Sequence, residues 1–153
     1  NMVLIIRYFL LFCAIIYFNE AKKEFSPPEI VCMDNLKIDK NYIEAIIEDN
    51  STQFLPENDE VFNKFLHCFF VARNLQDENG ELKYENIINH VKQLPRKYFG
   101  GEKNDEAPVG LPIATEATLS CKNLPRGDTY GKTAVQAQNC IDRKMTELIQ
   151  EGQ

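Results

Sequence analysis

The sequence predicts an all-α protein, a compact bundle of about six helices. Two observations lead to this fold class. Several segments place apolar residues three and four positions apart, which is the spacing of one face of a helix. No segment shows the strict alternation of apolar and polar residues that is typical of a half-buried strand. The cysteines add a third expectation, that two disulfides hold the bundle together.

The N-terminal segment 1–21 is predicted to be a signal peptide. Arg7 precedes an apolar run from Tyr8 to Phe18, whose length suits a signal-peptide core and is short for a membrane span. We expect cleavage after Ala21, which leaves residues 22–153 as a secreted, extracellular protein without stable membrane insertion. The alternative for this segment is a retained anchor helix.

The cysteine count indicates the disulfide framework. The chain has five cysteines, and Cys13 leaves with the signal peptide. An even number in a small secreted domain is typical of disulfide pairs, although four cysteines allow three pairings and their spacing does not choose among them. The four that remain are Cys32, Cys68, Cys121 and Cys140.

The first two helices are predicted from their capping residues. Ser26 and Glu29 flank two prolines and form a capping box, which starts a helix over about 27–36. Asp39 is an N-cap residue for a second helix, which ends near Asp49.

The central helix lies within Pro56–Gly80 and carries Cys68 in its middle. Acidic residues open it, which suits the positive end of a helix. Its apolar arc is wide, so more than one side of the helix must be covered. The arc consists of Val61, Phe62, Phe65, Leu66, Phe69 and Phe70.

Three more helices follow the turn at Gly80. Residues 82–94 show an apolar stripe that Pro95 ends. The glycines and prolines of 98–112 predict the least ordered part of the mature chain. A fifth helix is expected over 115–123 and a sixth over 129–150.

The residues predict a binding protein rather than an enzyme. A net charge of −6 argues against nucleic acid and against an anionic membrane surface as partner. His67 and His90 have no metal-binding residue at ligand spacing, and 77–80 lacks the acids of a calcium loop. No catalytic constellation and no cofactor motif is present, so we expect no metal and no cofactor.

Asn50 opens a glycosylation sequon, for which a bare loop is the alternative reading.

The cysteine frame carries a resemblance to a known family. In the insect odorant-binding proteins three residues separate the second and third of six conserved cysteines, and eight separate the fifth and sixth. Counting back from Cys68 and Cys140, these two positions hold Lys64 and Gly131. The segments VARNLQDENGELKYENIINHV and TAVQAQNCI also resemble that family. The chain therefore resembles the pheromone and general odorant-binding type over about 26–145, and its four cysteines resemble the minus-C subgroup. The 53-residue step from Cys68 to Cys121 is longer than is usual.

The resemblance implies a fold and a function. It implies that Cys32 pairs with Cys68 and Cys121 with Cys140, and that residues 22–153 form a helical domain around an apolar cavity. The implied function is to carry small hydrophobic ligands, such as odorants or pheromones, through aqueous fluid. The side chains expected to line the cavity are Leu66, Phe69, Phe70, Val71, Ile88, Val91, Leu119, Val135 and Ile141.

The position left by the missing bridge also carries an expectation. With Lys64 and Gly131 at these positions, no covalent bond links the two helices there, and Gly131 is expected to add backbone freedom. Cysteines introduced at both positions are expected to form a disulfide.

Two other functions fit the same residues. One is a carrier of this fold outside chemosensation, in saliva, haemolymph or reproductive fluid. The other is a secreted helical signalling protein with a solid core, which would act through its surface. The partners left open besides the ligand are a chemoreceptor and a second copy of the chain.

Overall fold

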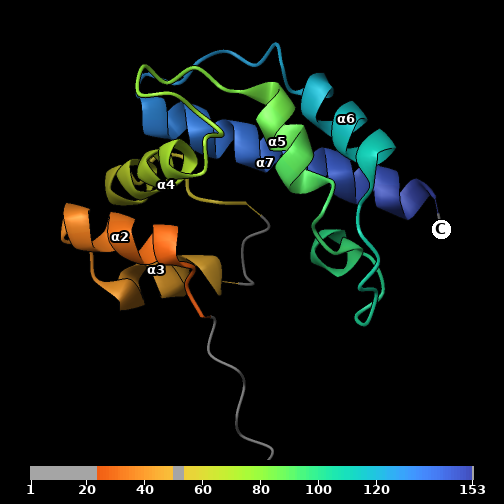
Figure 1. The fold of residues 1–153 in the computed structure, drawn as a ribbon, viewed down its shortest axis with the longest axis horizontal. Coiled ribbons are helices and arrows are strands. Elements are labelled where there is room, and N and C mark those ends of the chain that lie inside the picture. Colours follow the sequence, from red (N-terminus) through yellow and green to blue (C-terminus); the bar gives the residue numbers. More distant parts are fainter. Residues whose placement is uncertain (1–23, 50–53, 153) are drawn as a thin grey trace, which may run out of the picture.

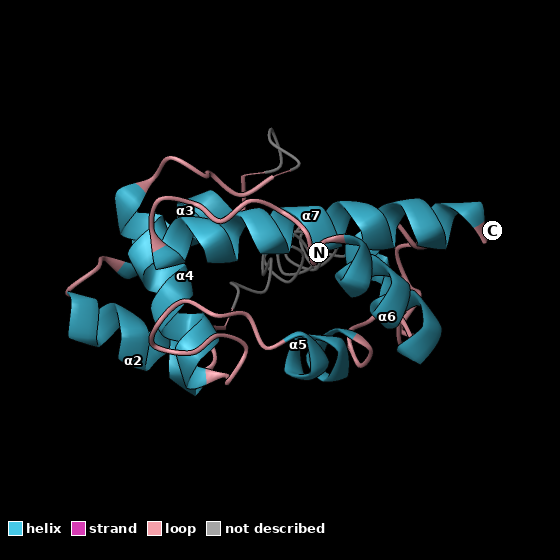
Figure 2. Cartoon of the chain, turned by 90° about the horizontal axis from the view of Figure 1, so that it is seen from above, coloured by secondary structure: helices cyan, strands magenta, loops and turns pink. Residues whose placement is uncertain are grey.

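The all-α prediction is confirmed. The computed structural model describes residues 24–49 and 54–152, and in these residues it contains helices and no strand (Figures 1 and 2). The predicted signal peptide 1–21 and the Asn50 sequon lie outside the described residues. The elements are α2 (Pro27–Leu36), α3 (Lys40–Ile47), α4 (Glu60–Ala72), α5 (Tyr84–Val91), the 3-10 turn η1 (Arg96–Phe99), α6 (Leu111–Ser120) and α7 (Tyr130–Glu151).

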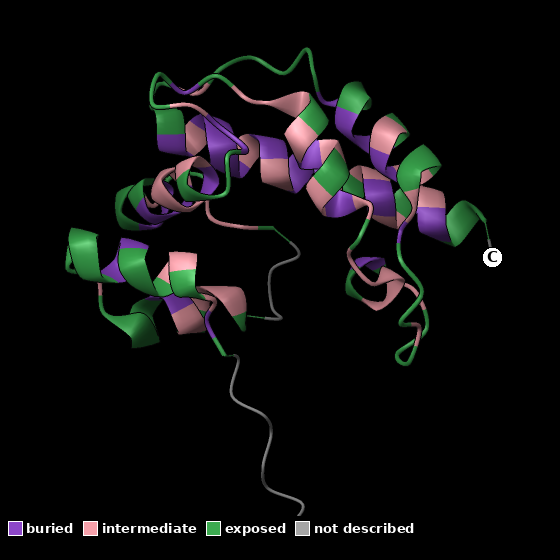
Figure 3. Ribbon diagram, viewed as in Figure 1, coloured by how far each residue is buried: buried purple, intermediate pink, exposed green. Residues whose placement is uncertain are grey.

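The other elements are arranged along α7, the longest helix. α4 packs on the N-terminal part of α7, and α6 and η1 pack further along it (Figure 1). α2 is attached through α4, and α5 lies against α6. Burial follows this arrangement, because buried residues recur along α7 and also lie on α4 and α6, the two helices that pack on it (Figure 3).

The predicted helix starts are confirmed by their caps. The backbone N–H and hydroxyl of Ser26 both donate to the Glu29 carboxylate at 2.7 Å, which completes the capping box of α2. Asp39 accepts from the N–H of Asn41 at 2.8 Å and starts α3. Asp59 accepts from the N–H of Phe62 at 2.9 Å and starts α4. Each cap satisfies an N–H group that the first turn of a helix leaves free.

The Gly- and Pro-rich stretch is more regular than predicted. η1 occupies part of it, and α6 begins at Leu111 instead of residue 115 because Pro112 sits in the first turn, where proline is favourable. Cys121 consequently caps the end of α6 instead of lying inside the helix. Backbone hydrogen bonds from Val109 to Leu94 and from Gly110 to Lys92 hold the approach to α6.

The core is formed by the predicted apolar faces. Its largest fully buried side chains include Phe62, Ile43, Met145 and Val135. The wide arc of α4 is covered only in part, since Val61 remains 42% exposed. On α7 the predicted apolar face is buried at Ala134, Ala137, Ile141 and Met145, whereas Leu148 is partly buried and Tyr130 is 49% exposed.

Both predicted disulfides are present. Cys32 pairs with Cys68 and ties α2 to α4, with 5.8 Å between their Cα atoms. Cys121 pairs with Cys140 and ties the end of α6 to α7, with a Cα separation of 6.0 Å. The pairing implied by the resemblance is therefore confirmed.

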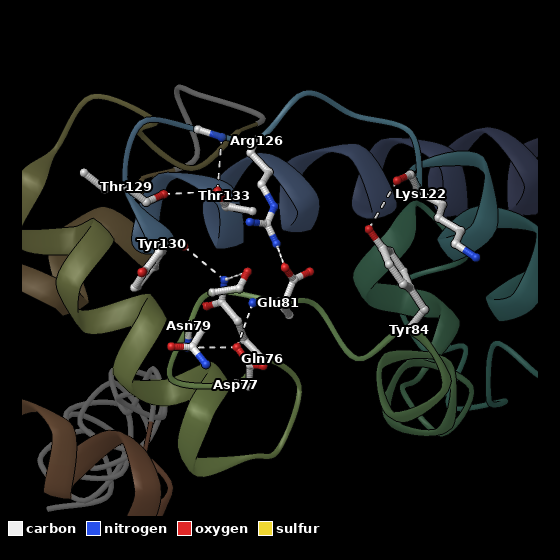
Figure 4. A network of polar contacts seen from close by, with 12 residues as sticks. Gln76, Asp77, Asn79, Glu81, Tyr84, Lys122, Arg126, Thr129, Tyr130 and Thr133 are labelled. Atoms are coloured by element: carbon white, nitrogen blue, oxygen red, sulfur yellow. Dashed lines mark hydrogen bonds and ion pairs between the residues drawn. The ribbon is translucent and has the colours of Figure 1, made fainter.

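A buried glutamine joins the turn after α4 to the start of α7. Gln76 is 1% exposed, and its Nε2 donates to the carbonyl oxygens of Gly80 at 2.9 Å and Tyr130 at 3.1 Å (Figure 4). Its Oε1 accepts from Nδ1 of His67 at 2.8 Å. One side chain thus satisfies polar groups on three segments. Nearby, Arg126 pairs with Glu81 at the surface.

We expect Gln76→Leu to lower the free energy of unfolding by about 2 kcal/mol, because it leaves buried polar groups without partners. The measurement is guanidinium denaturation followed by circular dichroism. Gln93→Leu is the matched control, since Gln93 is exposed and its side chain makes one hydrogen bond, to the Asn89 carbonyl of α5. Equal midpoints for the two variants would show that this junction does not depend on Gln76.

Candidate ligand-binding sites

A polar pocket of about 480 Å³ lies where the starts of α4 and α7 meet. Its lining includes Lys64 and Gly131, the two positions at which the odorant-binding frame has its missing bridge. The structure thus brings these two residues to one site, as the resemblance implies. The pocket carries charges of both signs, from Glu57, Glu60, Lys64, Asp128 and Lys132.

The two helices touch beside this pocket with no side chain between them. A Cβ atom built on Gly131 would lie 2.1 Å from the backbone oxygen of Asn63, a distance that no side chain tolerates. The two predictions for Gly131, added backbone freedom and a disulfide after substitution by cysteine, are therefore wrong. Gly131 serves close packing rather than backbone freedom, and a cysteine there cannot be accommodated unless α7 moves away from α4.

A second pocket, of about 290 Å³, lies between η1 and the C-terminal half of α7. Phe54, Tyr98 and Phe99 supply its aromatic surface, and Asp142 and Arg143 of α7 supply its charges. A third pocket, beside Cys121, measures about 40 Å³, which is little more than the space of one water molecule.

Asp142 is the chemically unusual group of the second pocket. It is half-buried, and it accepts one hydrogen bond from Nε2 of Gln138 at 2.7 Å. Burial raises the pKa of its carboxyl group to about 7, although the bond from Gln138 acts in the opposite direction. Asp142 is not among the site residues predicted from the sequence. Its only signal is a polar row at helical spacing, Gln138, Asp142 and Thr146, which runs beside the buried stripe of α7.

The comparison with protein families decides the classification. A family model described as the PBP/GOBP family matches residues 17–144. The chain belongs to this family, the insect odorant-binding proteins. A search of curated proteins and a search of solved structures each found no match.

Membership of the odorant-binding family confirms the predicted family and the general function. Its members are small odorant- or pheromone-binding carriers, and they are binding proteins rather than enzymes. No helix among residues 24–49 and 54–152 is both long and apolar enough to cross a membrane. The minus-C subgroup stays a prediction, to which the two disulfides of the four-cysteine frame conform.

The structure places most of the predicted lining residues in the interior of this odorant-binding fold. Phe69, Val71 and Ile88 are half-buried, whereas Leu119 is 47% exposed on α6. None of the nine residues lines the three pockets described above, so their contact with a ligand stays a prediction. The five that are buried in the core are Leu66, Phe70, Val91, Val135 and Ile141.

The two histidines lie apart and serve different contacts. His67 bonds to Gln76, whereas Nδ1 of His90 lies 3.4 Å from the Arg73 guanidinium. Burial, and secondarily the Arg73 charge, lowers the pKa of His90. In the part of the chain that the structure describes, no cluster of three His, Cys, Asp or Glu side chains could hold a metal ion.

Proposed function

We propose that the protein is a secreted carrier that binds small hydrophobic molecules, such as odorants or pheromones, in an apolar interior. The observation that supports this most is membership of the PBP/GOBP family over residues 17–144. The four-cysteine helical frame supports it further, because both disulfides link helices of one bundle.

The physical basis is the transfer of apolar surface out of water. A volatile hydrophobe is poorly soluble, and burying it gains about 25 cal/mol per Å² of apolar surface. Carrier pockets combine aliphatic and aromatic walls with a few polar groups that orient the ligand. The predicted lining residues on α4, α5 and α7 have this composition, with Phe69, Ile88 and Val135 as examples.

The carrier function is tested with residues 22–153 and the fluorescent probe N-phenyl-1-naphthylamine. We expect a blue-shifted, saturable signal with a dissociation constant of about 1 μM, and displacement by a long-chain alcohol. Phe69→Ala should weaken probe binding at least about fivefold, because a partly buried phenyl ring is removed from the predicted wall.

Val61→Ala is the matched control, since Val61 lies on the same helix and is exposed. Circular dichroism verifies that each variant is folded. A folded protein that leaves the probe in water would contradict the carrier function and favour a signalling protein that acts through its surface. The assay applies equally to a carrier in saliva, haemolymph or reproductive fluid.

A further inference from the structure

The pocket beside Asp142 has an unusual combination of walls. Phe54, Tyr98 and Phe99 enclose a volume of about 290 Å³ against α7. This volume is near the lower end for small-molecule sites, so the pocket suits a compact ligand. Asp142 is the only carboxylate among the lining residues that the structure describes.

Among the described residues, that carboxylate has no cationic partner. In residues 24–49 and 54–152, no lysine, arginine or histidine forms an ion pair with Asp142, and Gln138 provides its one side-chain hydrogen bond. A charge removed from water without a partner carries a large desolvation cost. A ligand cation placed in the pocket would offset that cost.

The aromatic rings of the pocket already attract cations of the protein itself. The Arg143 guanidinium lies over the Phe54 ring, 5.5 Å from its centroid, and the Lys97 ammonium lies 5.4 Å from the centroid of Tyr98. Such contacts arise because the face of an aromatic ring carries negative charge density. The net charge of −6 adds a long-range attraction for positive ligands.

We propose that this pocket is a site for a small organic ammonium ion, a primary or secondary amine on a compact apolar body. The ammonium group contacts the Asp142 carboxylate, and the apolar body packs against Phe54, Tyr98 and Phe99. The inference rests on the proposed carrier function and names one class of ligand for it. A neutral alcohol of the same shape gains the apolar contacts but not the ion pair.

The site predicts a dependence of amine binding on pH. Burial places the pKa of Asp142 at about 7, so the carboxyl group is half ionised near neutral pH. The amine keeps its proton up to about pH 10, like a lysine side chain. Amine affinity therefore rises with pH through neutrality and falls roughly tenfold per unit below about pH 6, where Asp142 is neutral.

The other charged groups near the pocket do not produce this dependence. Among the described lining residues, the other titratable groups are Tyr98 on η1 and Arg143 on α7. On η1, Arg96 donates to the Pro108 carbonyl and Lys97 pairs with Glu106. The hydrogen bond with Glu106 raises the pKa of the Lys97 ammonium, which moves its titration further from neutrality. His67 and His90 lie outside the described lining of the pocket.

The test compares 2-phenylethylamine with its neutral isostere 2-phenylethanol on residues 22–153, by calorimetry from pH 5.5 to 8.5. We expect Asp142→Asn to weaken amine binding at pH 8 at least about tenfold, by removing the charge that opposes the ammonium. The same variant abolishes the pH dependence and weakens 2-phenylethanol binding far less than amine binding, because an alcohol forms no ion pair with the carboxylate. Glu147→Gln is the matched control, because it removes one exposed carboxylate from the same helix.

A stability measurement tests the environment of Asp142 without any ligand. The pKa of this carboxyl is raised from 3.8 to about 7 in the folded state, so the unfolded chain ionises first as pH rises. The contribution of Asp142 to stability is therefore fully present below about pH 4 and is lost as pH rises toward 7. Asp142→Asn removes that loss, so its melting temperature exceeds that of the wild type at pH 8.

Two results would overturn the inference: equal amine affinity of wild type and Asp142→Asn at pH 8, or a pH dependence that persists in this variant. Binding of N-phenyl-1-naphthylamine separates the inference from the proposed carrier function. A probe that binds while Asp142→Asn leaves amine binding unaltered overturns the amine site alone. If the amine binds in an Asp142-dependent manner while the probe does not bind, the general hydrophobic carrier function is overturned and the amine site is supported.

Discussion

Replacing Cys32 and Cys68 by alanine will lower the free energy of unfolding by about 4 kcal/mol, and replacing Cys121 and Cys140 by about 3 kcal/mol. The order follows from the sequence separations of 36 and 19 residues, since a longer closed loop restricts the unfolded chain more. The two double variants therefore rank the two bridges.

The arrangement of the helices increases the difference between the bridges. Among the major contacts between elements, α2 is attached only through α4, whereas α6 packs on both α7 and α5. Loss of the first bridge should therefore release α2 locally before the whole protein unfolds.

Guanidinium denaturation measures the first effect, and amide hydrogen exchange over residues 27–36 measures the second. Thiol titration and peptide mapping of each variant verify that the remaining bridge is intact. Equal losses of stability, or unchanged exchange in α2, would contradict this assignment of roles.

Gly131→Ala will lower the free energy of unfolding by about 3 kcal/mol, toward the upper end of what overpacking costs. The added Cβ atom would lie 2.1 Å from the Asn63 backbone oxygen, and backbone cannot give way as a flexible side chain can. α7 must then move away from α4 along a contact that holds the core together. The direction of the stability change is informative, because replacing glycine by alanine within a helix ordinarily raises stability.

Gly152→Ala is the control, since the atoms nearest to a Cβ there lie 3.5 Å away in ordinary contact. Thermal and guanidinium denaturation of both variants, at the same protein concentration, give the comparison. A Gly131→Ala protein as stable as the wild type would show that α4 and α7 do not approach as closely as described. Probe binding by the same variant reports whether the displaced helices alter the interior.

The sequence alone predicted what depends on short stretches of chain. The capping box at Ser26, the N-cap at Asp39, the acidic start of the central helix and the apolar faces of the helices are formed by residues a few positions apart. Their geometry is decided within one or two helical turns, so they could be recognised without knowing the fold. The disulfide pairing followed from the resemblance in cysteine spacing, and the structure confirms it.

The start of α6 shows where local reasoning failed. Glycines and prolines in 98–112 predicted irregular chain, yet Pro112 opens the helix. The same residue type breaks a helix interior and favours a first turn, and only the surrounding structure selects between these roles.

Only the tertiary structure decided which side chains meet across long distances in the chain. Gly131 gives no sign in sequence that its Cα lies against the Asn63 backbone, nor Gln76 that it reaches Tyr130. In the sequence Asp142 looks like any other acidic residue on the polar side of a helix, and only the structure shows that Phe54 and η1 lie around it. Burial is a property of what surrounds a residue, and here the surroundings come from segments tens of residues away. Periodicity indicates which face of a helix turns inward, but packing alone determines whether a wall, a close contact or a pocket forms there.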